Sequence, residues 1–318
     1  ASGNFWPGLV QESNIEPQEG TFPVRYLGGT GRDVDLHVQG PRLYKYTQVS
    51  YPQDFRMLAW TLGSNVDAGS PSPYAHLITA LDNDVGTAFT SGPMNPFLSF
   101  GIEEANVVPG TGTNQVRTVK GLVVDDYELA GELGGILTQT ITAIGTSGTF
   151  SSGTPSTINA FNYGTAAIGS IVDRPYIFSD VSLSIPSGTL YESHSKFSLK
   201  VSNHSLARHY LAAGSRDAAA PQPTLRTIML DTGIDAMSET AKILIESYYM
   251  GGSDTNALLR INASTGSRDN FIILSGGRLL DPFEAPFAKE GINTQTLHLE
   301  FKSITGSCAD LMQKYNVY

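Results

Sequence analysis

Polar and apolar residues alternate through most of the chain, and the pattern predicts many short strands. In the second half, alternating runs separated by Ser, Gly and Pro occupy 177–185, 196–204 and 224–230. At 235–252 the apolar residues instead recur at helical spacing, with Asp235 placed as an N-cap and Gly251 placed just after the last turn. Strand-like runs then return, so this half is predicted as strands, one helix and more strands.

The first half shows the same order. Alternating runs such as LYKYTQVS precede a predicted helix over 52–63, with Pro52 near its start and Gly63 at its end. Further runs follow, among them QVRTVKGLVV and ILTQTITAIG. The order of elements therefore occurs twice.

A sequence repeat underlies this order. Residues 121–140 and 277–296 share G-x₃-D-x₂-E-x₆-G-I-x-T-Q-T without a gap, at an offset of 156 residues. Half of the 318 residues is close to that offset, as a tandem duplication requires. The repeated polar residues are the candidate structural or interface residues: Asp125, Glu128, Thr138, Gln139, Asp281, Glu284, Thr294 and Gln295.

The repeat also predicts the domains. We expect a first domain over 1–150 and a second over 151–318, joined by a Gly/Ser/Thr-rich linker at 145–157. The first half carries about 32 extra residues, which we place at 64–96. The Pro/Gly-rich composition of this insertion suggests either an extended arm that reaches a neighbouring ring or a disordered exterior loop.

The charge is low and acidic. Only 16% of residues are Asp, Glu, Lys or Arg, against about 25% in typical domains, and the net charge is −10. Two readings of the low charge stay open: faces covered by partners, or a Ser/Thr/Asn-rich surface on an ordinary β-protein. The acidic balance argues against a nucleic-acid binder, because affinity for phosphate comes from clustered Lys and Arg.

Catalytic motifs are absent. The sequence contains no nucleophile elbow, phosphate loop, dinucleotide fingerprint or zinc motif, and its six histidines offer no convincing metal pair. Paired catalysis by Asp125/Glu128 and Asp281/Glu284 is disfavoured, because equivalent positions in two repeats suit a duplicated structural contact. We therefore predict no catalytic residue, cofactor or metal. The single Cys308 excludes an intrachain disulfide, and the lack of a long apolar run or export signal predicts a soluble, non-exported protein.

The hairpin that contains the first copy of the repeat resembles that of a known protein family. Residues 119–142 hold a glycine, a strand, a turn and a second strand with G-G-x-L-T, and they resemble the closing hairpin of tailed-virus tail tube proteins. The resemblance is to long members whose tube domain is duplicated, and it extends over most of the chain apart from 1–20, the insertion and the last residues. The sequence SNHS stands where the family has paired asparagines.

The resemblance implies a fold of two tandem antiparallel β-sandwich or barrel domains, mainly β with one helix each. It implies a structural virion protein of a bacteriophage or archaeal virus, located in the tail and assembled in the host cytoplasm. Three chains would form a pseudo-six-fold ring, and stacked rings would conduct the genome. Its partners would be other copies, tail proteins at the tube ends and, in a contractile tail, a sheath. Viral double-stranded DNA would pass without specific binding, and no membrane is involved.

A geometric estimate agrees with a conduit. If each domain lends about four strands, roughly 24 strands spaced about 4.8 Å and tilted about 40° close at a diameter near 48 Å, wide enough for duplex DNA after side chains are added. Two alternatives stay open: the inner tube of a non-viral contractile injection system, and a tandem β-sandwich adhesin or carbohydrate-binding surface protein.

Overall fold

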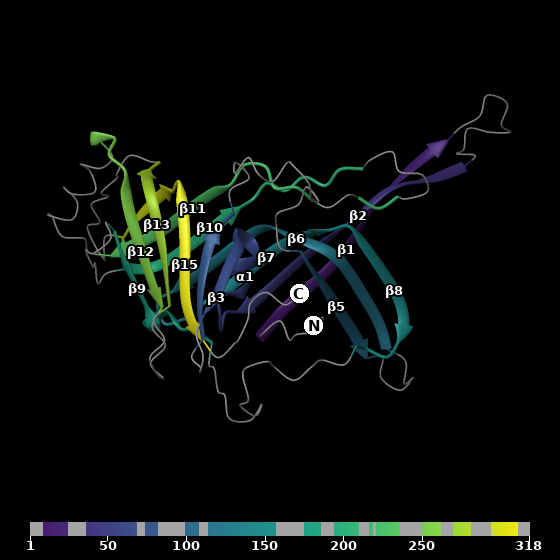
Figure 1. Cartoon of the computed structure of the whole chain (residues 1–318), viewed down its shortest axis with the longest axis horizontal. Helices are drawn as coiled ribbons and strands as arrows, with labels where there is room; N and C mark the ends of the chain where they lie inside the picture. Colours follow the sequence, from purple (N-terminus) through teal and green to yellow (C-terminus); the bar gives the residue numbers. More distant parts are fainter. Residues whose placement is uncertain are drawn as a thin grey trace.

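The protein is mainly β. The computed structural model describes residues 9–24, 36–68, 74–81, 99–107, 114–156, 175–185, 194–209, 216–218, 221–235, 250–261, 270–280 and 294–310. Within these ranges lie fifteen strands, one complete α-helix and one short 3₁₀ helix (Figure 1). The predicted β-rich class is confirmed.

The strands of the first half are β1 (Leu9–Val24), β2 (Leu36–Tyr51), β3 (Gly63–Ala68), β4 (Tyr74–Ala80), β5 (Phe100–Val107), β6 (Asn114–Glu132), β7 (Thr138–Gly145) and β8 (Ser147–Gly153). Helix α1 (Arg56–Leu62) lies between β2 and β3. The second half holds the 3₁₀ helix η1 (Phe178–Asp180) and the strands β9 (Val181–Ser184), β10 (His194–Ser202), β11 (Thr227–Asp235), β12 (Thr255–Ile261), β13 (Asn270–Leu279), β14 (Thr294–Glu300) and β15 (Ser303–Asp310).

One sheet runs through both halves. Its central part, here the main sheet, has the antiparallel order β1-β2-β7-β6-β10-β11-β14-β13. From β13 the ladder continues through β15, β4 and β3, while β5 and β8 branch from β6, and β12 and β9 branch from β13. The main sheet thus contains four strands from each half, side by side.

The pairing register of the first half recurs in the second. The pairs β1–β2 and β10–β11 align at an offset of 184 residues, so Glu12 opposite Val49 corresponds to Lys196 opposite Gly233. A β-bulge directly precedes Glu12 in β1 and Lys196 in β10. A bulge at the same position is a specific feature of a fold, so its recurrence favours a tandem duplication.

The remaining pairs agree as well. Phe100 opposite Leu122 in β5–β6 corresponds to Thr255 opposite Gly277 in β12–β13, at an offset of 155, and the register shifts after both. β7 and β8 correspond to β14 and β15 at an offset of 156, with β6 and β13 still at 155. We call β1–β8 the first repeat and β9–β15 the second repeat.

A glycine kink divides the long strand of each repeat. Gly121 in β6 and Gly276 in β13 have φ values of 66° and 69°, a left-handed conformation that glycine adopts without strain. After each kink the same hydrogen bond forms, from Thr146 N–H to the Lys120 carbonyl and from Lys302 N–H to the Ser275 carbonyl, both 3.1 Å. The kink lets one strand pair with β5 and β8 before it and with β7 and β10 after it.

The kink corrects the sequence alignment by one residue. The structural counterpart of Gly121 is Gly276, not Gly277, because backbone conformation rather than the letter pattern fixes the equivalence. The offset of 156 does hold for β7 and β14, which contain Thr138 and Thr294.

Two core positions have exchanged their side chains between the repeats. Leu122 packs over Gly145 in the first repeat, where a Cβ on Gly145 would approach Leu122 Cδ2 to 3.1 Å. At the corresponding positions of the second repeat stand Gly277 and Phe301, where a Cβ on Gly277 would lie only 2.3 Å from Phe301 Cε1. In each repeat one large side chain fills the space above one glycine.

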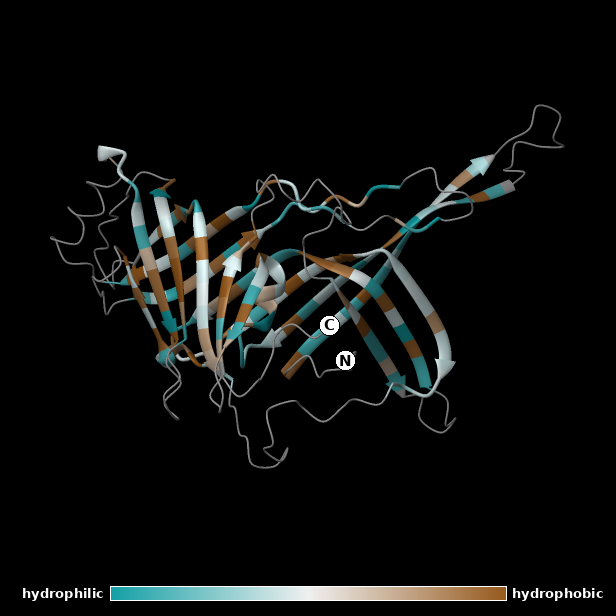
Figure 2. Cartoon of the chain, viewed as in Figure 1, coloured by the Kyte–Doolittle hydropathy of each residue, from teal (hydrophilic) through white to brown (hydrophobic). Residues whose placement is uncertain are grey.

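One face of the main sheet is apolar and buried, and the other is polar, as the alternating colours of Figure 2 show. Helix α1 covers part of the apolar face with Met57, Leu58 and Leu62, and it ends at Gly63, which has φ 89°. The predicted first helix is therefore confirmed, although it begins later than expected. The second predicted helix, 235–252, is wrong at its start, because Asp235 is the last residue of β11. Met250 and Gly251 are helical and Gly252 lies in a turn, while 236–249 lie outside the described residues.

Two other sequence-based expectations are wrong. Residues 147–153 of the expected linker form β8, whose backbone pairs with the first part of β6 and which ends after the expected boundary near 150. Within the 64–96 insertion, β3 and β4 form a hairpin that pairs with β15 of the same chain. It buries Ile78 and His76 completely, so this part is sheet and not a projecting arm; 82–96 lie outside the described residues.

The exchanged core pair allows a test of the repeat. We expect Gly277→Leu to destabilise the protein by about 2–3 kcal/mol through overlap with Phe301, and Phe301→Gly to cost more than about 3 kcal/mol by leaving a cavity. The double variant recreates the pair of the first repeat and should be more stable than the sum of the two losses by at least about 1 kcal/mol. Denaturant unfolding of the four proteins measures this coupling, and strict additivity would contradict the equivalence of the two sites.

Candidate assembly interface

The two repeats meet where β6 pairs with β10. This joint holds seven consecutive register pairs, from Glu132 opposite Lys196 to Asp126 opposite Ser202. It links strands about 70 residues apart and makes the two four-stranded sets one sheet. The repeats also meet where β4 pairs with β15, through six register pairs.

The buried face of the joint is apolar. Tyr127 and Leu129 of β6 lie opposite Val201 and Leu199 of β10, and all four side chains are at most 1% exposed. Burying four such side chains stabilises the joint by several kcal/mol, roughly 1.5–3 kcal/mol for each aliphatic one. The repeats are therefore held together by a continuous core as well as by backbone hydrogen bonds.

The polar face of the joint carries a row of charged groups. Ser198 Oγ donates a 2.6 Å hydrogen bond to Glu128 Oε1, and Lys200 Nζ lies 3.7 Å from Glu128 and 3.9 Å from Asp231. His298 Nδ1 lies 2.6 Å from Asp231 Oδ1 on the next strand. Because these groups are partly exposed, each pair contributes at most about 1 kcal/mol, but the row fixes the register of four neighbouring strands.

Asn203 fastens the end of the joint. Its side chain is 1% exposed, and its Nδ2 donates to the carbonyls of Thr61 (2.9 Å) and Val124 (3.0 Å). Its Oδ1 accepts a 3.1 Å hydrogen bond from Arg226 Nε, and Arg226 also donates to the Leu81 carbonyl. One amide thus connects the end of α1, strand β6 and the segment before β11.

Asp125 lies beside this amide. Its carboxylate accepts a 2.6 Å hydrogen bond from the Ser205 N–H, and its backbone carbonyl accepts one from the Asn203 N–H at 2.7 Å. Burial raises the pKa of the Asp125 carboxyl, while the hydrogen bond from Ser205 opposes that shift. The residue holds the turn after β10 against β6, which is a structural task.

The structure places the other predicted residues as follows. Glu128 belongs to the row on the polar face, Thr138 lies opposite Ala130 at the start of β7, and Gln139 is buried with its Nε2 3.5 Å from Ser50 Oγ. Thr294 and Gln295 of β14 pair with Asp235 and Ile234 of β11. Asp281 and Glu284 lie outside the described residues.

Sequence reasoning missed Asn203, Lys200 and Asp231. The alternation in 196–204 does put Ser198 and Lys200 on one face, but only the register with β6 and β11 shows which acids they meet. Asn203 is the second residue of the SNHS turn, and its local sequence does not show which carbonyls its amide meets.

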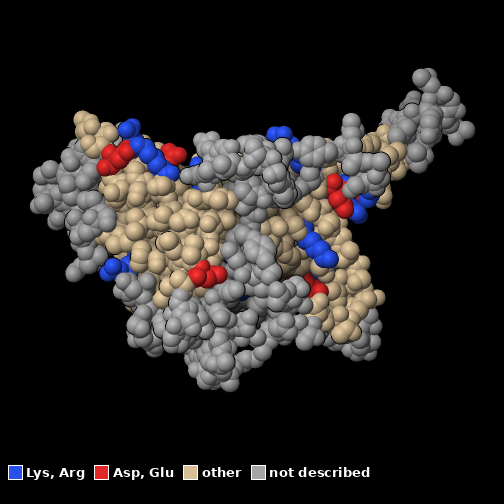
Figure 3. All heavy atoms as spheres, viewed as in Figure 1, with Lys and Arg blue, Asp and Glu red and all other residues tan. Residues whose placement is uncertain are grey.

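The polar face of the main sheet, here called the bare face because no described helix packs on it, is acidic. Among the described residues, its acidic side chains on the eight strands are Glu12, Glu16, Asp126, Glu128, Glu132, Asp231, Asp235 and Glu300. Its basic side chains are Lys45, Lys196, Lys200 and Arg278. Acids therefore outnumber bases on this face by eight to four. In the view of Figure 3, by contrast, the described surface is mostly uncharged, with small mixed groups of acids and bases.

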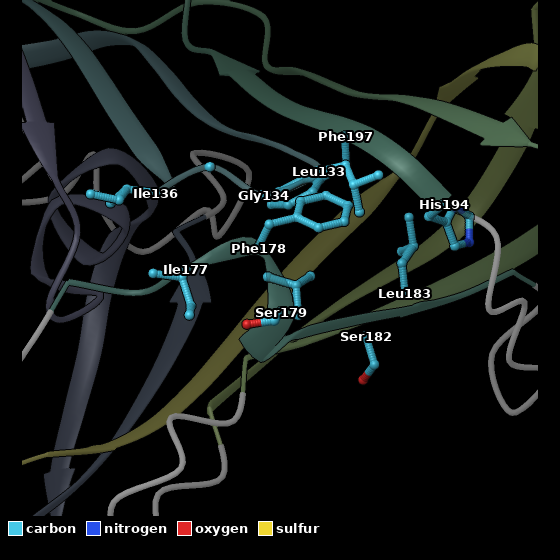
Figure 4. A pocket seen from close by; sticks show the side chains of 12 residues that line it. Leu133, Gly134, Ile136, Ile177, Phe178, Ser179, Ser182, Leu183, His194 and Phe197 are labelled. Carbon is cyan, nitrogen blue, oxygen red and sulfur yellow. The ribbon is translucent and has the colours of Figure 1, made fainter.

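An apolar hollow opens at the rim of the joint, between the β6–β7 turn, η1 and the start of β10 (Figure 4). Its volume is about 630 Å³, and its walls include Leu133, Ile136, Phe178, Leu183 and Phe197. Leu133 is 74% exposed at the turn, so the hollow has an apolar lip as well as an apolar floor.

His194 lies at the edge of this hollow. Its Nδ1 is 2.8 Å from Thr232 Oγ1, and burial lowers the pKa of its imidazole to about 4. The ring is therefore neutral near pH 7, and it serves packing and hydrogen bonding.

The described residues contain no cluster of three or more His, Cys, Asp or Glu side chains arranged to hold a metal. Among the same residues, no helix has the length and apolar character needed to span a membrane. No known protein-family model matches the chain, and no curated protein matches it significantly.

Asn203 provides a test of the joint. Asn203→Asp keeps the shape but replaces the donor to the Thr61 and Val124 carbonyls with an acceptor, so we expect a loss of at least about 3 kcal/mol at pH 7. Asn203→Ala should cost about 2–3 kcal/mol. Solvent-exposed Asn106→Asp is the matched control and should change stability by less than about 0.5 kcal/mol. Urea unfolding compares the variants, and equal losses at both positions would contradict the role of Asn203.

The depressed pKa of His194 predicts a pH dependence. Between pH 6.5 and about 4 the unfolded chain binds a proton that the folded protein excludes, so His194 lowers stability as the pH falls through that window. We expect the loss to reach about 2 kcal/mol, reduced by the partial solvent access of the ring. His194→Gln should flatten this part of the profile of unfolding free energy against pH. Parallel profiles for the two proteins would show that the imidazole is not the cause.

Proposed function

We propose that this chain is the major tube subunit of a viral tail, and that three copies form each ring of a hollow tube through which double-stranded DNA passes. The two-faced main sheet is the observation that best supports this proposal. The main sheet consists of two register-matched sets of four strands, apolar and buried on one face and polar on the other, where no described helix packs. A sheet of this kind suits the wall of a water-filled channel.

The strand number fits a conduit. Three chains with eight main-sheet strands each supply roughly 24 strands, which close at a diameter near 48 Å at ordinary spacing and tilt. Six single repeats would be presented in such a ring, although it contains only three chains. In this arrangement the apolar face and α1 lie outside the barrel, and the bare face lines the bore.

The charge of the bare face fits passage rather than binding. Duplex DNA carries one negative charge per about 1.7 Å, so a basic wall would hold it along the whole tube. A face with twice as many acids as bases repels the phosphates weakly, and the DNA remains free to slide. The structural roles of the half-buried Asp125 and the buried Asn203 are also consistent with a protein that works by assembly.

Assembly is the direct test. Negative-stain microscopy of the concentrated full-length protein should show rings and stacked tubes, and mass measurement of single rings should give three 34.0-kDa chains. A protein that stays monomeric at millimolar concentration would instead favour the adhesin alternative. Rings of six full chains would contradict the trimer.

A second test concerns DNA. We expect no measurable affinity for duplex DNA at low salt, whereas the triple variant Glu12→Lys, Glu16→Lys, Glu300→Lys should bind with an affinity that falls steeply as salt rises. The matched triple variant to Gln removes the same acids without adding bases and should bind far more weakly than the Lys variant. Gel-shift titrations at two salt concentrations separate these outcomes. Micromolar, salt-dependent binding of duplex DNA by the unmodified protein would contradict the proposal that DNA slides freely through the bore.

A further inference from the structure

Three polar side chains lie inside the apolar layer of the first repeat. Gln48 of β2, Gln139 of β7 and Tyr127 of β6 are 1%, 4% and 1% exposed. Gln48 and Tyr127 are the register partners of Ile141 on its two sides, and Gln139 stands just before Ile141 on the same face of β7. Direct and diagonal neighbours on one face of a sheet are close enough for long side chains to meet, so the three polar groups lie around one apolar residue.

Each of these side chains carries one buried polar atom that has no hydrogen-bond partner in the described part of the chain. The three atoms are Gln48 Nε2, Gln139 Oε1 and Tyr127 Oη. Buried polar groups in folded proteins are almost always hydrogen-bonded, either to protein or to ordered water. Three unpaired atoms in one patch of the core therefore indicate a ligand that pairs with them.

The chemistry of the three atoms selects a neutral ligand that both donates and accepts. Tyr46 Oη donates a 2.7 Å hydrogen bond to Gln48 Oε1, which leaves the amide nitrogen of Gln48 as a donor to the site. Burial, and then the charge of Asp54, raise the pKa of Tyr127, so its hydroxyl stays protonated and is a second donor. Gln139 Oε1 is an acceptor. A cation would meet two donors, an anion would meet the amide oxygen, and either charge would be costly to bury.

We propose that one internal water molecule binds between β2, β7 and β6, where it accepts hydrogen bonds from Gln48 Nε2 and Tyr127 Oη and donates one to Gln139 Oε1. Three hydrogen bonds are typical of a buried water, which pairs groups that the protein itself leaves unsatisfied. The neighbouring Leu129 and Ile141 are at most 1% exposed, so the site is enclosed. The water therefore exchanges with solvent only when the sheet opens locally, and it is long-lived.

The second repeat satisfies its corresponding polar group by direct contacts. At the offset of 184 residues, Tyr46 and Gln48 correspond to Leu230 and Thr232. Thr232 is 0% exposed, and its hydroxyl donates a 3.1 Å hydrogen bond to the Lys196 carbonyl and lies 2.8 Å from His194 Nδ1. The water site thus depends on side chains of the first repeat and not on the shared fold. It is also independent of whether the chain forms a tube.

Relaxation dispersion of the water ¹⁷O nucleus tests the site, because it counts long-lived internal waters and is unaffected by the exchange of side-chain protons. The triple variant Gln48→Leu, Gln139→Leu, Tyr127→Phe removes all three partners, and we expect its signal to fall by one water. Thr232→Val is the matched control, since it removes a buried hydroxyl that direct contacts satisfy, and it should leave the signal unchanged. A triple variant with the full signal of the unmodified protein would overturn the proposal.

A single substitution provides a second measurement that does not depend on the folding of the triple variant. Tyr127→Phe keeps the ring and removes only the hydroxyl, so loss of its bond to the water should lower the ratio of folded to unfolded protein by roughly twofold to tenfold in urea unfolding. Tyr44→Phe removes a hydroxyl that donates a 3.2 Å hydrogen bond to the Gly148 carbonyl, and its loss should be of similar size. An unchanged or higher ratio for Tyr127→Phe would show that the hydroxyl has no partner and would refute the water site.

Discussion

A strand can belong to two sheets only if its backbone turns between them, and this constraint organises the whole molecule. Gly121 and Gly276 make that turn in β6 and β13, each with a left-handed backbone and the same following hydrogen bond. A side chain at either position would meet Thr146 or Lys302 at less than 3 Å. Because glycine permits the kinks, one long strand in each repeat belongs both to the main sheet and to a branch of it, formed with β5 and β8 in the first repeat and with β12 and β15 in the second.

The main sheet in turn depends on its ladder being continuous. The joint between β6 and β10 combines a buried apolar side, a polar row and the Asn203 amide, so the two repeats share one continuous sheet. The inserted β3–β4 hairpin adds to this by covering the edge of β15. Among the described residues, β1 at one end of the main sheet pairs with β2 alone, and β3, β5, β8 and β9 likewise pair with one other strand each.

Much of this architecture could be predicted, because side-chain alternation reports burial directly. The runs in β10, β11 and β7 were recognisable, and so were α1 and the repeated motif. β1 was not, because only Ile15 is buried along most of its length and its backbone ladder to β2, which no side-chain pattern records, holds it in place. The sequence alignment placed Gly121 on Gly277, one residue from its structural counterpart Gly276. The two glycines are adjacent, and only the backbone angle distinguishes them. The partners of Lys200 and Asn203 lie on strands distant in sequence, so composition and spacing could not reveal them.

The exchanged pair of glycine and large side chain has a genetic consequence. Two similar coding segments in one gene can recombine with each other and lose or gain a repeat. A hybrid that crossed between these positions would place Leu122 beneath Phe301, or Gly145 beside Gly277, and so would carry either a collision or a void in the core. The compensated difference would therefore act against recombination between the halves, because either hybrid core would be less stable.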